Sequence, residues 1–275
     1  MLKYEEQYLN LGNRILEEGV WVENKRTGRK CLTIPEAEVK IYGEEIPLLT
    51  TKQSYPVSAL AEILGYLRGY EWADQFDKIG AKTWYVNANE TEAWLNNPNR
   101  LRENHIGKVY GAAVGSYEID SLMNKLNAKE DDRALVLEFW RPELFDKGCL
   151  KSCMHRHQWV ILGDTLYLKS SSRSVDYACG LNFNSLQCWF LLKMVAEAVG
   201  LKAGYATHTM THVHIYDSHI DNVKMQLKRE PLNTAPNVEI HPFTLMDLFE
   251  ERHAREYFSV TGYEHLGKIE FDLVA

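Results

Sequence analysis

The sequence predicts an α+β fold, with a mixed sheet of the α/β type and flanking helices, from three observations. Some stretches of the 275 residues carry apolar side chains at helical spacing, and others are rich in β-branched and aromatic residues. The two kinds of stretch do not alternate strictly, which argues against a doubly wound sheet. No internal repeat or low-complexity linker interrupts the chain, so one domain over residues 1–275 is the simpler prediction.

The N-terminal half is predicted to contain two helices. Residues 4–18 have apolar residues at helical spacing, and Gly19 follows at the position of a C-terminal cap. Residues 57–68 repeat this spacing until Gly69, and Glu62 lies in this helix beside its apolar face. Residues 87–107 are polar and rich in asparagine, which predicts a loop.

The C-terminal half supplies the predicted strands and two further helices. Strands are expected over residues 134–140 and 155–174, the second being a hairpin that turns at Gly163 and Asp164. An apolar helix is expected over residues 185–199, ending at Gly200. A strand over residues 206–216 and a helix over residues 217–228 complete the prediction.

Composition and charge argue against several functional classes. The formal charge is −7 and no long basic tract exists, which argues against binding a nucleic-acid backbone, although a few arginines suffice for one nucleotide. No apolar run of about 18 residues exists and the N-terminus lacks a signal-peptide pattern, so a cytoplasmic location is expected. Five cysteines, an odd number, suggest reduced thiols rather than a disulfide framework.

Cys153 allows three interpretations from the residues alone. With Cys149, His155 and His157 it forms a C-x3-C-x-H-x-H arrangement, and on a strand the last three side chains would share one face and could bind zinc. That spacing matches no common zinc pattern. A free cysteine is most often a small buried hydrophobe, which spacing alone favours. The third interpretation is a nucleophile, which requires a cationic neighbour to stabilise its thiolate.

Seven short blocks of sequence bear on this choice. They are KRTG (25–28), PLLTTK (47–52), AEILGYLRG (61–69), VYG (109–111), RSVDYACGLNFN (173–184), HIYDSH (214–219) and QLKREP (226–231). Their order, and the length of the chain, resemble the thymidylate synthase family. The separation of Cys153 and Arg173 is similar to that between the family's nucleophile and its phosphate-binding arginine. The resemblance therefore implies a thymidylate synthase fold and favours Cys153 as the nucleophile.

The resemblance also implies a reaction, the transfer of a one-carbon group from 5,10-methylenetetrahydrofolate to carbon 5 of a pyrimidine nucleoside monophosphate, without a metal. Cys153 would add to ring carbon 6, because a thiolate is a soft nucleophile that can leave again, and Arg173 would favour its charged form. Glu62 would be the acid–base group acting through water, although alone it suggests a surface carboxylate. Asn184 would bind O4 and N3–H of uracil, and a flipped amide would suit cytosine.

The remaining implied residues bind phosphate, sugar and co-substrate. Arg26, Arg173 and Ser174 would hold the phosphate, and Arg133 would reach it from a second subunit, so a homodimer is expected. His214 and Tyr216 lie two apart on a strand and would contact the sugar 3′-hydroxyl. The full set comprises catalytic Cys153, Glu62, Arg173, Asn184, Asp176 and Tyr110; substrate-binding Arg26, Arg133, Gln158, Arg173, Ser174, Asn184, His214 and Tyr216; and cofactor-binding Trp84, Asp176, Gly180 and Phe183.

The chain departs from the family pattern at several positions. The differing residues are Ser152 and Met154 beside the nucleophile, Ala112 to Val114 after VYG, Asp132 before Arg133, Thr211 and His212, and Asn87 in place of a second tryptophan. These departures resemble the hydroxymethylase branch, in which water rather than folate hydride completes the reaction.

The departures therefore favour 5-hydroxymethylation of dUMP over other reactions, with dCMP the second and CMP or UMP the third choice of substrate. A divergent thymidylate synthase that methylates dUMP is the alternative. A catalytically inactive nucleotide- or RNA-binding module is a further one, against which the acidic charge and the retained Cys153, Glu62, Arg173 and Asn184 weigh.

Overall fold

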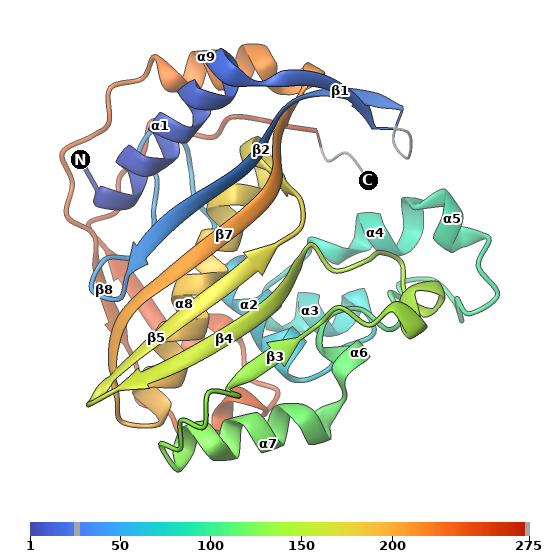
Figure 1. The fold of residues 1–275 in the computed structure, drawn as a ribbon, viewed down its shortest axis with the longest axis vertical. Coiled ribbons are helices and arrows are strands. Elements are labelled where there is room, and N and C mark those ends of the chain that lie inside the picture. The colour runs from blue at the N-terminus through green and yellow to red at the C-terminus, as the bar shows by residue number, and fades with distance from the viewer. Residues whose placement is uncertain (25–27, 273–275) are drawn as a thin grey trace.

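The computed structural model describes residues 1–24 and 28–272 and is built on a mixed sheet (Figure 1). Seven strands of the described residues form it, in the order β1-β2-β7-β5-β4-β3 with β6 beside β7. Their bounds are Val20–Asn24 (β1), Arg29–Tyr42 (β2), Val136–Glu138 (β3), Met154–Leu162 (β4), Thr165–Ser172 (β5), Val175–Asp176 (β6) and Lys202–Tyr216 (β7). β5 and β6 run parallel to β7, and the other pairs are antiparallel. A separate pair joins Asn237–Ile240 (β8) to Phe258–Thr261 (β9).

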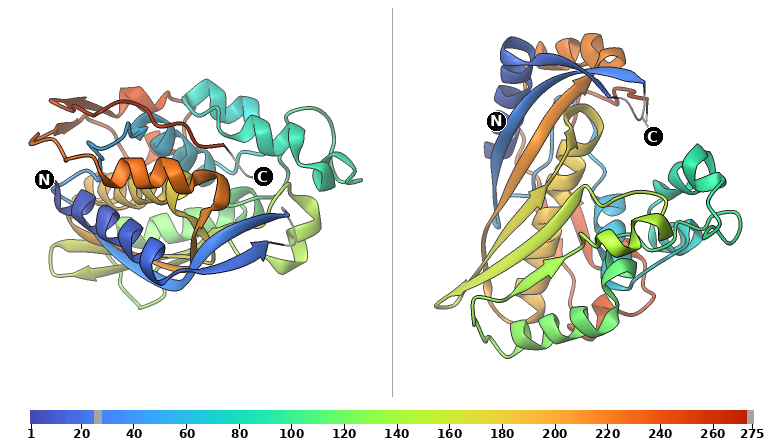
Figure 2. Two further views of the ribbon diagram at one scale, coloured as in Figure 1. Left: turned by 90° about the horizontal axis from the view of Figure 1, so that it is seen from above. Right: turned by 45° about the vertical axis from the view of Figure 1, so that its right-hand side comes forward.

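The helices gather on one face of the large sheet, and the opposite face of β2, β7, β5 and β4 carries no helix of the described chain (Figure 2). Their bounds are Lys3–Glu18 (α1), Pro56–Leu67 (α2), Ala73–Ile79 (α3), Trp84–Glu90 (α4), Glu92–Leu95 (α5), Gly111–Val114 (α6), Ser116–Asn127 (α7), Asn182–Ala198 (α8) and Ile220–Leu227 (α9). α8 is apolar on most sides because it lies between the sheet and α2. This arrangement confirms the α+β prediction. Within the described ranges, no helix has the length and apolar character that crossing a membrane requires.

Most predicted elements are confirmed. The helices α1, α2, α8 and α9 lie where apolar spacing indicated them, and the hairpin of β4 and β5 turns at Gly163, whose φ is +61°. The region 87–107, predicted as a loop, is partly helical, so that prediction was wrong. α4 and α5 form there because Ala88 and Trp94 are buried and anchor otherwise polar turns.

The long strand β2 was not predicted. It contains Pro35, which lacks a backbone N–H and normally argues against a strand inside a sheet. Ile34 pairs with Val213 and Glu36 with Thr211, so Pro35 lies opposite His212, and the pairing with β1 has already ended at Thr33. The proline is tolerated because one edge of β2 has no strand partner there.

Candidate active site

The predicted nucleophile lies beside an arginine. Cys153 directly precedes β4, and Arg173 directly follows β5. Nη2 of Arg173 lies 3.6 Å from Sγ of Cys153, and the Arg173 backbone N–H donates to the Cys153 carbonyl at 3.0 Å. The same guanidinium donates to the carbonyls of Ser152 at 3.0 Å and Lys151 at 2.8 Å. Arg173 thus holds the loop that carries Cys153 and supplies an adjacent positive charge, which a thiolate there would require.

Tyr110 supports the same loop from the other side. Its hydroxyl accepts the Cys153 backbone N–H at 3.3 Å, and its ring stacks on Tyr66 with the centroids 4.1 Å apart. The backbone φ of Tyr110 is +46°, which a bulky residue rarely adopts and which costs roughly 1–3 kcal/mol. Packing between Tyr66, Trp84 and Phe139 holds it in this conformation. Strain held by surrounding contacts is typical of functional sites.

Glu62 is buried rather than exposed, with 7% of its surface accessible. The Tyr66 hydroxyl donates to its Oε2 at 2.7 Å and Nε2 of Gln187 donates to the same oxygen at 2.8 Å, while the Thr83 hydroxyl donates to Oε1. Burial raises the pKa of Glu62, and these three hydrogen bonds to its charged form oppose the rise. A fixed carboxyl with a raised pKa can both accept and donate a proton near neutral pH.

Two predicted substrate residues hold unpaired polar atoms. Asn184 is half-buried, and its amide has no hydrogen-bond partner among the residues that the structure describes. His214 is buried, with Nδ1 3.0 Å from the His212 carbonyl and Nε2 without a partner in the described chain. Because a carbonyl only accepts, Nδ1 carries the proton, and Nε2 is left as a bare acceptor. Burial lowers the pKa of His214, which keeps the ring neutral.

The predicted co-substrate residues combine aromatic surface, open space and one carboxylate. Trp84 is buried against Tyr110, and Phe183 is half-buried against the core. A Cβ added to Gly180 would meet only the Cβ of Asp176, at 3.9 Å, so the glycine borders open space. Asp176 caps the short helix η2 (Tyr177–Leu181) by accepting two backbone N–H groups. Open space beside a glycine and a carboxylate acceptor suits the edge of a flat, hydrogen-bonding ring such as a pterin.

The remaining predicted residues form no hydrogen bond with Cys153 or Glu62 in the described chain, or fall outside it. Arg26 falls outside the described residues. Arg133 is exposed before β3, and Gln158 is half-buried within β4. Ser174 is half-buried next to Arg173. Within the described ranges, none of these three side chains forms a hydrogen bond with Cys153 or Glu62.

The alternative zinc site at Cys153 is not supported. The pairing register shifts between Met154 and Arg156, so strand alternation does not carry Cys153, His155 and His157 onto one face. His157 is buried, and its Nδ1 lies 2.8 Å from the Ser170 hydroxyl. One group of three potential metal ligands occurs in the described part of the chain, namely Asp176, Cys179 and His219, and Cys153 is not among them.

Sequence reasoning missed several partners of the predicted residues. Tyr66 lies four residues after Glu62 on α2, and this helical spacing could have identified it. Gln187 and Thr83 come from other elements, and no local signal pointed to their contacts with Glu62. His219 is buried near Asp176 and also escaped notice.

Comparison with known proteins gives matches along nearly the whole chain. The model of a family described as thymidylate synthase matches residues 6–275. The thymidylate synthase of Pseudoalteromonas translucida is 46% identical over 271 residues, which cover 94% of this chain and 95% of the relative. That of Idiomarina loihiensis is 45% identical over 271 residues, with the same two coverages. That of Shewanella loihica is 44% identical over 279 residues, covering 96% of this chain and 98% of the relative.

Proposed function

The chain belongs to the thymidylate synthase family, and from this premise we propose that it methylates dUMP at ring carbon 5 with 5,10-methylenetetrahydrofolate. The departures in sequence favoured hydroxymethylation. Relatives that are 43–46% identical carry the name thymidylate synthase, and they support methylation more strongly. The observation that carries the proposal is the contact of Cys153 with Arg173, next to a tyrosine pair that leads to buried Glu62.

Cys153 is the proposed nucleophile. Its thiolate adds to ring carbon 6, which makes carbon 5 nucleophilic, and it leaves again at the end of the reaction. The guanidinium of Arg173 at 3.6 Å stabilises the negative charge on sulfur. Hydrogen bonds from Arg173 to the carbonyls of Lys151 and Ser152 fix the loop, so the sulfur need not be reoriented when the nucleotide binds.

Glu62 is the proposed acid–base group. The three donors around it fix the carboxyl, and burial raises its pKa towards the range in which it exchanges protons. It would exchange protons through water with the ring carbonyl and with carbon 5.

Asn184 and His214 are the proposed contacts to base and sugar. The unpaired amide of Asn184 offers one donor and one acceptor, which match O4 and N3–H of uracil. The bare Nε2 of His214 accepts the hydrogen of the 3′-hydroxyl, and Tyr216 lies beside it with the ring centroids 4.9 Å apart. Arg173 and Ser174, together with Arg26 beyond the described residues, would bind the phosphate.

The folate co-substrate supplies the one-carbon unit and, in methylation, the hydride. Trp84 and Phe183 would contribute the apolar walls of its site, and the open space at Gly180 would admit its ring. The carboxylate of Asp176 would accept a ring N–H.

A homodimer is the proposed assembly. The face of β2, β7, β5 and β4 carries no helix in the described chain (Figure 2), and it is the proposed surface that pairs with its copy. Exposed Arg133 would then reach the partner's phosphate site. Arg133→Ala and Cys153→Ser chains, each inactive alone, should regain about a quarter of wild-type activity when refolded together, because half of the dimers then carry one complete site. No recovery would contradict a shared site.

The product distinguishes the proposed reaction from its alternatives. The protein would be incubated with 5,10-methylenetetrahydrofolate and, separately, dUMP, dCMP, UMP or CMP, while product mass and dihydrofolate absorbance are followed. We expect a methylated product from dUMP with one dihydrofolate per turnover, and none from Cys153→Ser. Nucleotide binding without turnover in any tube would support the inactive binding module.

Hydroxymethylation is the second candidate, and Asn87 favours it. This half-buried polar residue lies on α4, three positions after Trp84, where the family pattern has a second tryptophan. An amide there can order a water that an indole would exclude. A hydroxymethylated product formed without dihydrofolate would establish this reaction and contradict methylation.

A further inference from the structure

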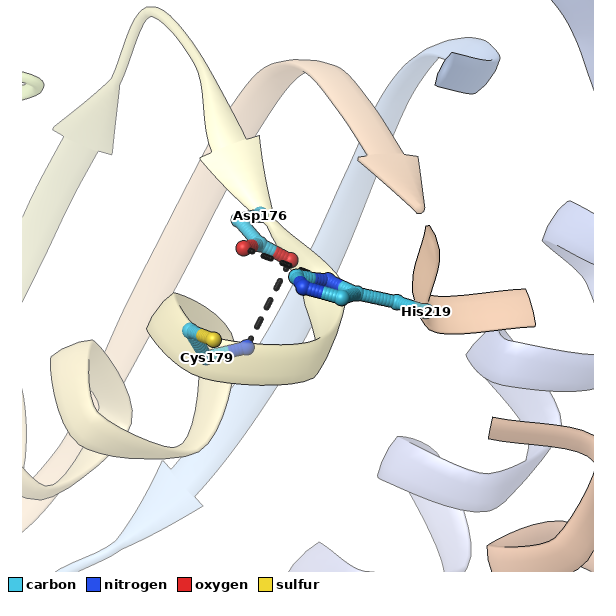
Figure 3. A group of neighbouring side chains, drawn as sticks. All are labelled: Asp176, Cys179 and His219. Carbon is cyan, nitrogen blue, oxygen red and sulfur yellow. Dashed lines mark hydrogen bonds and ion pairs between the residues drawn. The ribbon is translucent and has the colours of Figure 1, made fainter. Parts of the chain in front are cut away.

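Asp176, Cys179 and His219 converge from two segments at one end of the sheet (Figure 3). Asp176 and Cys179 lie at the start of η2, and His219 ends the short helix η3 (Asp217–His219). The carboxylate, thiol and imidazole atoms all lie within 4.8 Å of one another. Cys179 and His219 have no role in the proposed reaction.

The protonation of His219 leaves an unsatisfied atom at the centre of this group. Nε2 lies 3.0 Å from the carbonyl oxygen of Asp272, so it must carry a hydrogen. In a neutral ring Nδ1 is then a lone pair, and it faces Oδ2 of Asp176 at 3.9 Å. That separation is about 1 Å longer than a charge-assisted hydrogen bond.

Nδ1 has no partner in the described chain, and the side chain is 1% exposed. An unpaired acceptor in a buried site costs roughly 1–3 kcal/mol. A cation between Nδ1 and the half-buried Asp176 carboxylate would pair with this nitrogen.

The donor atoms select the kind of cation. One imidazole nitrogen, one sulfur and one carboxylate oxygen form a typical Zn²⁺ set, and three protein ligands leave a fourth position open. The ligands are also oriented by outer contacts. Oδ1 of Asp176 accepts the Ala178 N–H at 2.8 Å and the Cys179 N–H at 3.4 Å, and the Asp272 carbonyl fixes the ring of His219.

Lys52 is a competing cation near this group. Its side chain is buried, donates to the Ala178 carbonyl and lies over the rings of Tyr8 and Phe271. Its charge acts on Asp176 and Cys179, so it opposes a second cation there. Lys52 therefore lowers the affinity of the site for a cation, and replacing it with an uncharged residue should raise that affinity.

We propose that Asp176, Cys179 and His219 bind a Zn²⁺ ion. The Cys179 thiol gives its proton to solvent as the Zn–S bond forms, so one proton is released for each ion, and the carboxylate and neutral imidazole bind without further proton transfer. The site does not depend on the proposed reaction. If Asp176 also contacts the folate, Zn²⁺ will compete with it, and this consequence alone rests on the proposed function.

Cobalt substitution gives a test that needs no turnover, because a thiolate bound to Co²⁺ produces a charge-transfer band in the near ultraviolet. Wild-type protein and the matched variants Cys153→Ser and Cys149→Ser should show this band, while Cys179→Ser and His219→Asn should lose it. Lys52→Met should bind Co²⁺ about tenfold more tightly. A band that persists in Cys179→Ser, or that disappears in Cys153→Ser, would overturn the assignment.

Alkylation of the wild-type protein tests the site without any substitution, so the result does not depend on whether a variant folds. Zn²⁺ should protect Cys179, and not Cys153, from iodoacetamide, as read from peptide masses. Calorimetry in two buffers of different ionisation enthalpy should find one proton released per ion. Equal alkylation of Cys179 with and without Zn²⁺ would contradict the site, whatever the result of the dUMP assay.

Discussion

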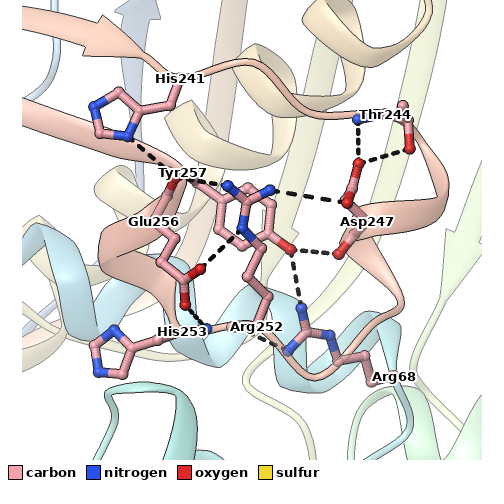
Figure 4. A network of polar contacts seen from close by, with 8 residues as sticks. All are labelled: Arg68, His241, Thr244, Asp247, Arg252, His253, Glu256 and Tyr257. Atoms are coloured by element: carbon pink, nitrogen blue, oxygen red, sulfur yellow. Dashed lines mark hydrogen bonds and ion pairs between the residues drawn. The ribbon is translucent and has the colours of Figure 1, made fainter.

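Two polar regions of the molecule differ in how fully their side chains are paired. The first is the Arg68–Tyr257 network (Figure 4), which comprises Arg68, His241, Thr244, Asp247, Arg252, His253, Glu256 and Tyr257. The Tyr257 hydroxyl accepts from Nη2 of Arg68 at 3.2 Å and donates to the Asp247 carbonyl. Arg252 lies 4.7 Å from the centre of the Tyr257 ring and pairs with Asp247 and Glu256. These contacts tie the segment around residues 241–257 to the end of α2.

The second region is the candidate active site, where several polar atoms lack partners in the described chain. They include the buried Nε2 of His214 and, beside Asp176, the buried Nδ1 of His219. Such atoms reduce stability unless a ligand pairs with them. The network is therefore expected to stabilise the fold, whereas the unpaired atoms of the candidate active site should reduce stability and remain available to a ligand. An unpaired atom does not by itself identify a binding site, because the buried residues His157 and His208 in the sheet also hold unpaired nitrogens and have no role in the proposed reaction.

The largest effect should follow removal of the proposed nucleophile. Cys153→Ser should lower kcat on the order of 10⁴-fold, because a hydroxyl near Arg173 is not ionised and adds poorly to the ring. Steady-state kinetics and a thermal melt would measure activity and stability separately. Cys149→Ser, which alters a buried cysteine, is the matched control and should keep kcat. Comparable losses in both variants would argue against a special role for Cys153.

Glu62→Gln should have the next largest effect. Its amide can occupy the same space but cannot transfer protons, so kcat should fall by about 10²–10⁴-fold while the KM for dUMP changes little. Glu118→Gln, which removes an exposed carboxylate paired with Arg141, is the control and should be silent. A rise in KM with unchanged kcat would make Glu62 a binding residue instead.

Two buried histidines of the sheet, His157 and His208, should make the free energy of unfolding depend on pH. Burial lowers the pKa of His157 to about 3 and that of His208 to about 4. The folded-state pKa values lie below the unfolded value of about 6.5, so this stability is present above pH 6.5 and is lost as pH falls. Between pH 7 and 5 each histidine should reduce the free energy of unfolding by roughly 2 kcal/mol. Urea unfolding of wild type and His208→Gln would measure this, and an equal pH slope in both would contradict it.

The smallest effect should come from the Arg68–Tyr257 network. Tyr257→Phe removes a hydroxyl that both accepts and donates, so the free energy of unfolding should fall by about 1–2 kcal/mol and Tm by a few degrees. kcat should not change. A tenfold loss of kcat at unchanged Tm would show that the Arg68–Tyr257 network is coupled to the candidate active site. It would contradict the view that the network only stabilises the fold.

The sequence predicted those features that depend on local pattern. Apolar spacing located α1, α2, α8 and α9, and the glycine at position 163 located the hairpin. The pairing of Cys153 with Arg173 followed only from the resemblance to a family. In the structure the two residues meet because β4 and β5 form an antiparallel hairpin. Cys153 precedes the first strand and Arg173 follows the second, so both lie at the open end of the hairpin.

Features that depend on distant contacts could not be predicted. Gln187 reaches Glu62 from α8, and His219 approaches Asp176 from the end of β7, and neither contact leaves a periodic signal. The strand β2 was obscured by Pro35, whose tolerance depends on where β1 ends. The departures of the sequence from the family pattern favoured hydroxymethylation. The names of the similar proteins shifted the favoured reaction to methylation.

The most direct test of the central claim is the mass of a trapped adduct. A dUMP analogue with fluorine at carbon 5 cannot lose a proton there, so with 5,10-methylenetetrahydrofolate the covalent intermediate should accumulate. We expect the mass of the protein to rise by that of one nucleotide plus one folate, and peptide mapping to locate both on Cys153. An adduct on Cys179 or Cys149, or no adduct while the nucleotide still binds, would contradict Cys153 as the nucleophile.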